Sequence, residues 1–110
     1  MGGRDYVGEF ELVVLLALAR LEGGGYGASI HGEILDTTGR DVSIPAVYVT
    51  LKRLEAKGLV ESSVGASSIG SRRSTRNYRL VPAGREAIER SRRQFEQLWG
   101  APPIRGEVGS

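Results

Sequence analysis

The 110-residue sequence predicts a mainly α domain with a small β-hairpin, an α+β fold, and three observations support this prediction. Four segments carry apolar residues at helical spacing and are bounded by capping residues or glycines. Two short segments of strand-like composition flank a loop rich in Gly and Ser. The composition, 40% hydrophobic and 25% charged, is typical of one globular domain with one core. We therefore expect three N-terminal helices, a two-stranded hairpin and one C-terminal helix.

The first helix is expected over residues 9–21. Its apolar residues cover nearly the whole circumference, so the helix needs apolar cover on two sides. One side is expected to face the core of the domain, and the other a second subunit. Phe10 and Val14 are the residues of this helix that we assign to a dimer interface.

Four glycines at positions 23, 24, 25 and 27 predict a flexible connection into a second helix over residues 28–38, which Gly39 ends. A phosphate-binding loop is another interpretation of these glycines, but no strand precedes them and no Gly-Lys-Ser/Thr follows. His31, the single histidine, is interpreted as a solvated surface residue. The predicted buried stripe of this helix consists of Ile30, Ile34 and Leu35.

The third helix has the clearest boundaries. Ser43 is a suitable N-cap, Pro45 fits the first turn, and Gly58 can end the helix, so we expect it over residues 44–57. At 100° per residue, its predicted core stripe is Ile44, Val47, Leu51 and Leu54, with Tyr48 on the edge. The opposite face carries Pro45, Ala46, Val49, Lys52, Arg53 and Ala56.

That opposite face is small near its start and cationic further along. Small side chains let a helix approach base edges in the major groove of DNA, and Lys52 or Arg53 can contact a phosphate or a guanine edge. Taken alone, the pattern also fits an ordinary amphipathic surface helix. Two helices joined by a short turn, the second of them capped and basic, form the layout of a helix-turn-helix.

The hairpin is expected from strands at residues 59–64 and 75–80. Between residues 62 and 80 the chain has no acid and four arginines, Arg72, Arg73, Arg76 and Arg79. A basic hairpin beside a recognition helix is a wing, which can follow the DNA backbone or enter a minor groove. The alternative is a solvated, charged loop.

The last helix is expected over residues 82–99. Ile88, Phe95, Leu98 and Trp99 lie on one side of it and form a short seam that requires a partner helix, so we assign them to the dimer interface. Trp99 and Phe95 can also line a cavity for a small, flat aromatic effector. The alternative is that Trp99 only packs the dimer. The predicted organisation is a winged helix-turn-helix DNA-binding domain at 1–81, a dimerisation helix at 82–99 and a disordered tail at 100–110.

The charge is divided unevenly along the chain. Residues 1–42 have a net charge of −4 (three basic, seven acidic), and residues 43–110 have +6 (twelve basic, six acidic), which favours a polyanionic partner for the second half. One histidine, no cysteine and no hydrolase or metalloprotease motif argue against an enzyme. We predict no metal and no cofactor. The longest apolar run, residues 12–19, is too short to cross a membrane, so we expect a cytoplasmic protein.

Three segments, YGASIHGEILDTTG, SIPAVYVTLKRLEAKGLVESS and SRRSTRNYRLVPAGREAI, occur in an order and spacing that resembles the winged helix-turn-helix domain of PadR-like transcriptional regulators. The resemblance covers about residues 9–98 and is closest to the short subfamily with one C-terminal helix. Val81 stands where the family usually has Thr, so the last helix is expected to lack a side-chain N-cap.

The resemblance implies a homodimeric repressor that binds a pseudopalindromic operator in double-stranded DNA and is released by a small effector or a stress signal. The DNA-binding positions that it implies in the third helix and the wing are Ser43, Pro45, Ala46, Tyr48, Val49, Lys52, Arg72, Arg73 and Arg76. Two alternatives remain open, a winged-helix protein-interaction module and a small-molecule sensor, each without a direct DNA target. An interaction module is expected to have acids among its wing arginines, and this chain has none there.

Overall fold

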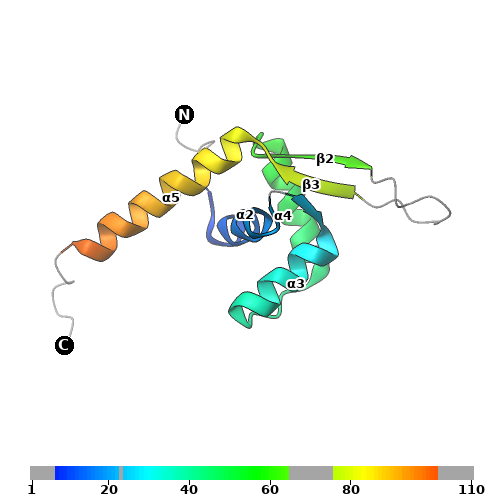
Figure 1. Ribbon diagram of the computed structural model, residues 1–110, viewed down its shortest axis with the longest axis horizontal. Coiled ribbons are helices and arrows are strands. Elements are labelled where there is room, and N and C mark those ends of the chain that lie inside the picture. The colour runs from blue at the N-terminus through cyan, green and yellow to red at the C-terminus, as the bar shows by residue number, and fades with distance from the viewer. Residues whose placement is uncertain (1–6, 23, 65–75, 102–110) are drawn as a thin grey trace.

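The computed structural model describes residues 7–22, 24–64 and 76–101. This part of the chain contains four helices and three strands (Figure 1). In chain order they are α2 (Glu9–Arg20), β1 (Gly24–Tyr26), α3 (Gly27–Thr38), α4 (Ile44–Ala56), β2 (Val60–Val64), β3 (Arg76–Leu80) and α5 (Pro82–Gly100). The predicted α+β fold is confirmed, and each predicted helix is present within one residue of its expected ends.

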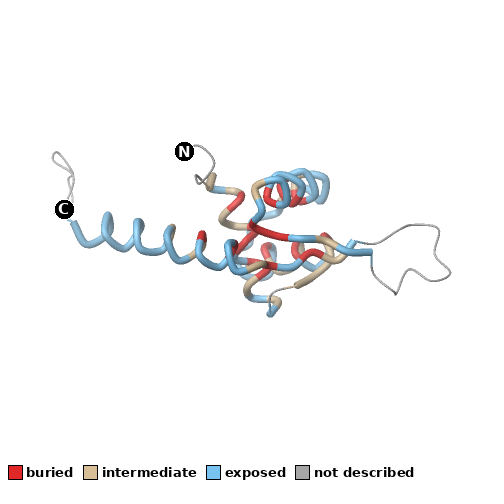
Figure 2. The backbone as a smooth tube through the Cα atoms, turned by 90° about the horizontal axis from the view of Figure 1, so that it is seen from above, coloured by how far each residue is buried: buried red, intermediate tan, exposed pale blue. Residues whose placement is uncertain are grey.

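The core is built around α2, which lies between the other helices and the sheet (Figure 1). Figure 2 shows that buried residues gather there, whereas the far half of α5 is exposed along its length. The residues with no more than 2% of their surface exposed come from every large element: Val14, Leu15, Leu18, Ile30, Ile34, Val47, Leu51, Leu54, Tyr78 and Ala87. The helix-turn-helix thus packs on a single apolar core.

The sheet has three strands, whereas the sequence predicted two. Its order is β1-β3-β2, and both pairs are antiparallel. The glycine-rich segment that was expected to be a flexible connection forms β1 instead, with Gly24 opposite Arg79 and Tyr26 opposite Asn77. This prediction was wrong because β1 has no alternating apolar pattern, and it becomes a strand by pairing with the open edge of β3. The predicted tip of the hairpin lies outside the described residues.

The signals that bound α4 act as the sequence predicted. The Ser43 hydroxyl accepts a hydrogen bond from the Ala46 N–H at 3.2 Å, and Gly58 adopts a left-handed conformation with φ 78°. Gly39, which ends α3, has φ 75°. At the start of α5, Val81 provides no side-chain cap, as expected, and Pro82 occupies the first position. The turn between α3 and α4 is therefore fixed by local chemistry at both ends.

Two residues of the predicted buried stripes are exposed. Ile44 is 42% exposed and Leu35 is 39% exposed, so the prediction that they belong to the core was wrong. Both lie in the terminal turn of a helix, next to the connection between α3 and α4. The spacing of apolar residues predicts which face of a helix is turned toward the core. It does not predict how far along that face the neighbouring elements cover it.

Candidate nucleic-acid interface

The candidate interface is the face of α4 that points away from the core. Val47, Leu51 and Leu54 on the inner face have no exposed surface. On the outer face Val49 is 52% exposed and Tyr48 is 37% exposed. The other predicted contact residues of this face are exposed or, for Ala46, half-buried: Ser43, Pro45, Ala46, Lys52 and Arg53. All the residues of the third helix that we predicted to contact DNA are therefore at least partly exposed.

Lys52 and Arg53 carry the positive charge of this face. Neither forms an ion pair with another described residue, although the Arg53 charge also acts on the Glu11 carboxyl and lowers its pKa. They follow a small, apolar stretch around Val49 on the same face. A helix with this profile has the shape and charge to enter a major groove about 12 Å wide.

The end of α4 is held to the start of α2 by a partly buried ion pair. The Lys57 ammonium lies 2.7 Å from Glu11 Oε1, which also accepts a hydrogen bond from the Gly8 N–H at 2.9 Å. Burial raises the pKa of the Glu11 carboxyl, but the hydrogen bonds from Lys57 and Gly8 lower it by more, so its pKa lies below its usual value. This pair, which the sequence did not indicate, fixes the end of α4 on the domain.

The turn before α4 is anchored on the same end of α2. The Arg40 guanidinium donates to both carboxylate oxygens of Glu9, at 2.7 and 3.3 Å, and lies 5.3 Å from the centroid of the Phe10 ring. The hydrogen bond from Arg40 lowers the pKa of Glu9. Phe10 thus packs on its own core beneath Arg40. Its assignment to a dimer interface stays a prediction, and the residue is already partly buried within the protomer.

The base of the wing is linked to α4 through hydrogen bonds. Arg76 Nη1 donates to Ser62 Oγ at 3.1 Å, and the Ser62 hydroxyl donates to Glu55 Oε2 at 2.8 Å. Arg79 is paired with Glu61 across β2 and β3, so its charge is offset within the protein. Arg76 is exposed at the edge of the wing. The predicted contact residues Arg72 and Arg73 lie outside the described residues.

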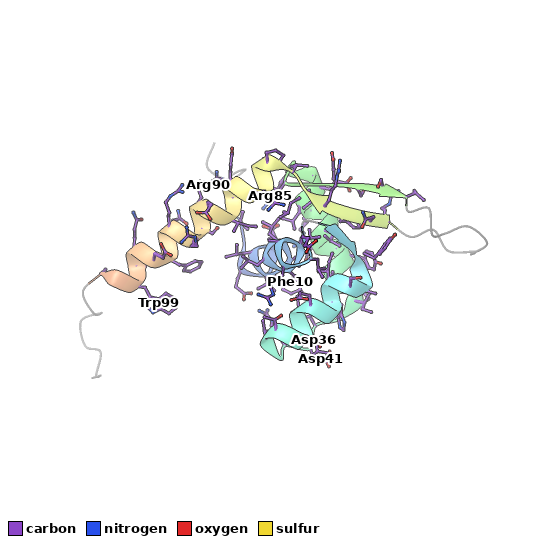
Figure 3. The ribbon with its side chains drawn as sticks, in the orientation of Figure 1. Phe10, Asp36, Asp41, Arg85, Arg90 and Trp99 are labelled. Atoms are coloured by element: carbon purple, nitrogen blue, oxygen red, sulfur yellow. The ribbon has the colours of Figure 1, made fainter. Side chains whose placement is uncertain are left out.

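A second surface, the α2–α5 groove, is apolar. It has a volume of about 390 Å³ and lies between the two helices. Phe95, Leu98 and Trp99 near the end of α5 are 49%, 72% and 84% exposed. Phe10 is not one of the residues that line the groove, and Figure 3 shows it well away from Trp99. The residues that line the groove are Leu12, Leu16, Ile88, Arg92, Phe95, Glu96 and Trp99.

The structure corrects which face of α2 is left uncovered. Val14 has no exposed surface, so its assignment to a dimer interface was wrong. The helix turns Val14 into the core of its own protomer and leaves Leu16, 43% exposed, on the outside. The error arose because α2 is apolar on nearly every side, and its sequence does not show which side faces inward.

His31, the single histidine of the sequence, lies near one acidic side chain. His31 Nε2 lies 3.9 Å from Asp41 Oδ1, with the imidazole 21% exposed. Among residues 7–22, 24–64 and 76–101, no cluster of three metal-ligating side chains exists. In the same part of the chain, no helix is long and apolar enough to span a membrane.

Comparison with known proteins identifies relatives that share this arrangement. The model of the transcriptional regulator PadR-like family matches residues 14–90. The transcriptional regulator Rv3488 of Mycobacterium tuberculosis is 40% identical over 73 residues, which are 63% of this chain and 65% of that protein. This chain therefore aligns with slightly less than two thirds of that regulator's length.

Two solved structures resemble the fold closely. RosR of H. salinarum has a TM-score of 0.68 and 26% identity, over 88% of this chain and 81% of that one. F93 from STIV, a winged-helix DNA-binding protein, has a TM-score of 0.71 over 84% of this chain and 94% of that one, and at 15% identity it shows the fold alone. Because the family match covers more than half of the sequence, the chain belongs to the PadR-like family of transcriptional regulators, which are DNA-binding proteins and not enzymes.

Proposed function

We propose that this chain is a homodimeric repressor that binds a pseudopalindromic operator in double-stranded DNA in the cytoplasm. The observation that carries the proposal is the outer face of α4, on which the exposed charges of Lys52 and Arg53 adjoin the small, exposed surface around Val49. In the complex, α4 of each protomer enters the major groove of one half-site. Lys52 and Arg53 contact phosphates or guanine edges there.

The wing supplies further contacts to the DNA backbone. Arg76 is exposed at the start of β3, next to Ser62, and the sequence adds Arg72 and Arg73 to the same hairpin. Arginine is favoured in narrow minor grooves, where the negative potential is enhanced. The hydrogen bonds from Arg76 through Ser62 to Glu55 keep the wing at a fixed place relative to α4. Both parts can then engage one half-site together.

The second copy of the chain covers the α2–α5 groove. Exposed apolar residues on the end of α5 reach beyond the body of the domain, and Leu16 of α2 continues the same surface. Two copies related by a twofold axis bury this surface on both sides. The dimer presents its two α4 helices to half-sites about 10 bp apart, or a multiple of that spacing.

A small, flat aromatic effector or a stress signal releases the DNA. Phe95 and Trp99 line the groove, and their rings offer stacking surfaces to an aromatic compound held between the subunits. Trp99 is the single tryptophan of the chain, so its fluorescence reports on this site directly. Planar aromatic compounds that quench this fluorescence are expected to weaken operator binding. Quenching without any change in DNA affinity would mean that Trp99 packs the dimer and has no part in release.

The decisive variant for the DNA contact is Val49→Glu. It places a carboxylate at the centre of the proposed contact face, where phosphates repel it, and should reduce affinity for the DNA upstream of the chain's own coding region by roughly a hundredfold or more. Ala83→Glu, an exposed position on α5, is the matched control and should bind like the wild type. Fluorescence anisotropy measures both, and circular dichroism checks the folding. If Val49→Glu and the wild type bind this DNA with equal affinity, α4 does not enter the major groove. That result would favour a protein-interaction module.

A further inference from the structure

The start of α3 and the recognition helix touch at one glycine. Gly27, the first residue of α3, is buried, and the ring of Tyr48 from α4 lies directly against it. A Cβ atom built on Gly27 would come within 2.6 Å of Tyr48 Oη and 2.7 Å of Cε1. Real Cβ atoms do not approach other atoms so closely, so any side chain at position 27 displaces the ring.

Backbone conformation does not explain the glycine at this position. Gly27 begins a regular α-helix, and its φ is not in the left-handed region, in contrast with Gly39 and Gly58. Alanine is the better residue for such a helical position. Gly32, five residues further along α3, shows the difference, because no atom lies within 4 Å of a Cβ built there. The closest conflict at position 27 is therefore with the tyrosine ring.

The ring also belongs to the proposed DNA-contacting face. Tyr48 is 37% exposed and lies one helical turn before Lys52 and one after Pro45, at the edge of the outer face of α4 nearest to α3. The rest of the ring rests on Gly27. The contact with α3 thus determines where the phenol stands beside Lys52.

We infer that Gly27 is a positioning residue for DNA binding, which seats the hydroxyl end of the Tyr48 ring so that the exposed part of the ring meets the operator together with Lys52. This inference rests on the proposed function. A side chain at position 27 pushes the ring off α3 and into the space that the duplex must occupy. The domain can remain folded with the ring displaced, because the ring is already partly in solvent.

The experiment is a double-mutant cycle on the full-length chain, with DNA affinity and melting temperature measured for each variant. Gly27→Ala should weaken operator binding roughly tenfold or more, the size of one lost specific contact, while the protein still melts cooperatively. Tyr48→Ala removes the ring, and adding Gly27→Ala to it should change the affinity by no more than about twofold. Gly32→Ala is the matched control and should bind as the wild type does.

A measurement without DNA tests the contact itself. Nuclear Overhauser effects between the Gly27 α-protons and the Tyr48 ring protons are expected in the wild type and absent in Gly27→Ala. Their absence from the wild type would overturn the inference, whatever the DNA result. So would an equal loss of affinity from Gly27→Ala with and without the tyrosine ring.

The outcomes also separate this inference from the proposed function. If the wild type binds the operator and Gly27→Ala binds it equally well, the inference is wrong and the repressor assignment stands. If the wild type binds no operator, both are wrong. If Gly27→Ala does not fold, Tyr48→Phe tests the inference instead. This variant keeps the ring on Gly27 and should preserve most of the affinity that Tyr48→Ala loses.

Discussion

Replacing Phe95 by Asp tests whether a second copy covers the α2–α5 groove. Phe95 is 49% exposed in the protomer, so about half of its transfer free energy, roughly 1–1.5 kcal/mol, remains to be gained by burial in a dimer. A twofold dimer contains this residue twice, which gives about 2–3 kcal/mol, or roughly a 30- to 150-fold weaker dimerisation constant. The carboxylates add a further desolvation cost. We expect Phe95→Asp to be monomeric at concentrations where the wild type is dimeric.

The assay is sedimentation equilibrium or light scattering over a range of protein concentrations. Gln97→Asp is the matched control, because it introduces the same charge at an exposed position on the opposite face of α5. It should dimerise like the wild type. If Phe95→Asp dimerises as tightly as the wild type, or the wild type is monomeric throughout, the second copy does not cover this groove.

Three further predictions concern stability and DNA binding. Glu11→Gln should cost about 1–3 kcal/mol at neutral pH, because it neutralises one partner of a charged hydrogen bond. Since the folded-state pKa of Glu11 is lowered, its contribution is complete above the unfolded-state pKa and is lost as the pH falls through the folded-state pKa, so the variant and the wild type should converge in acid. The double variant Arg72→Ala with Arg73→Ala should weaken binding to all DNA sequences alike and reduce the salt slope by about 1–2 units. Gly84→Ala should cost about 1–3 kcal/mol, because its Cβ would strike a backbone carbonyl.

For each of these variants, either a control variant or a result that would contradict the prediction can be named. Glu9→Gln alters a more exposed pair and should leave the stability nearly unchanged, which separates the effect of burial from that of charge. Gly100→Ala, with open space around its Cβ, should not destabilise the fold, in contrast with Gly84→Ala, which meets the Leu59 carbonyl oxygen. If the double arginine variant shows the same salt dependence of DNA affinity as the wild type, the wing does not contact the DNA. Urea titrations and binding isotherms decide these cases.

Helix α4 was predictable because local chemistry defines it. Ser43, Pro45 and Gly58 act on their own backbone or on residues within a turn, so their sequence order is sufficient to place the helix ends. The exposed outer face of α4 followed from the same periodicity. The bounds of α4 and the identity of its outer residues were therefore available before the structure.

Features that depend on distant parts of the chain were not predictable in this way. The strand β1 exists because β3 offers it an open edge, and its own residues give no alternating signal. The pairing of Glu11 with Lys57 joins residues 46 positions apart. The contacts of Gly27 with Tyr48 and of Gly84 with Leu59 are close approaches between elements, and a glycine in the sequence does not reveal them. Each depends on how the elements pack, which periodicity alone does not specify.

The salt dependence of DNA binding by the wild type tests the central claim most directly. The DNA upstream of the chain's own coding region is compared with a scrambled duplex of the same length, from low to physiological salt. A DNA-binding repressor should bind the upstream DNA far more tightly, and log K should fall with log salt by about 0.9 for each phosphate contacted. Equal and weak binding to both duplexes, with a shallow slope, would contradict the account.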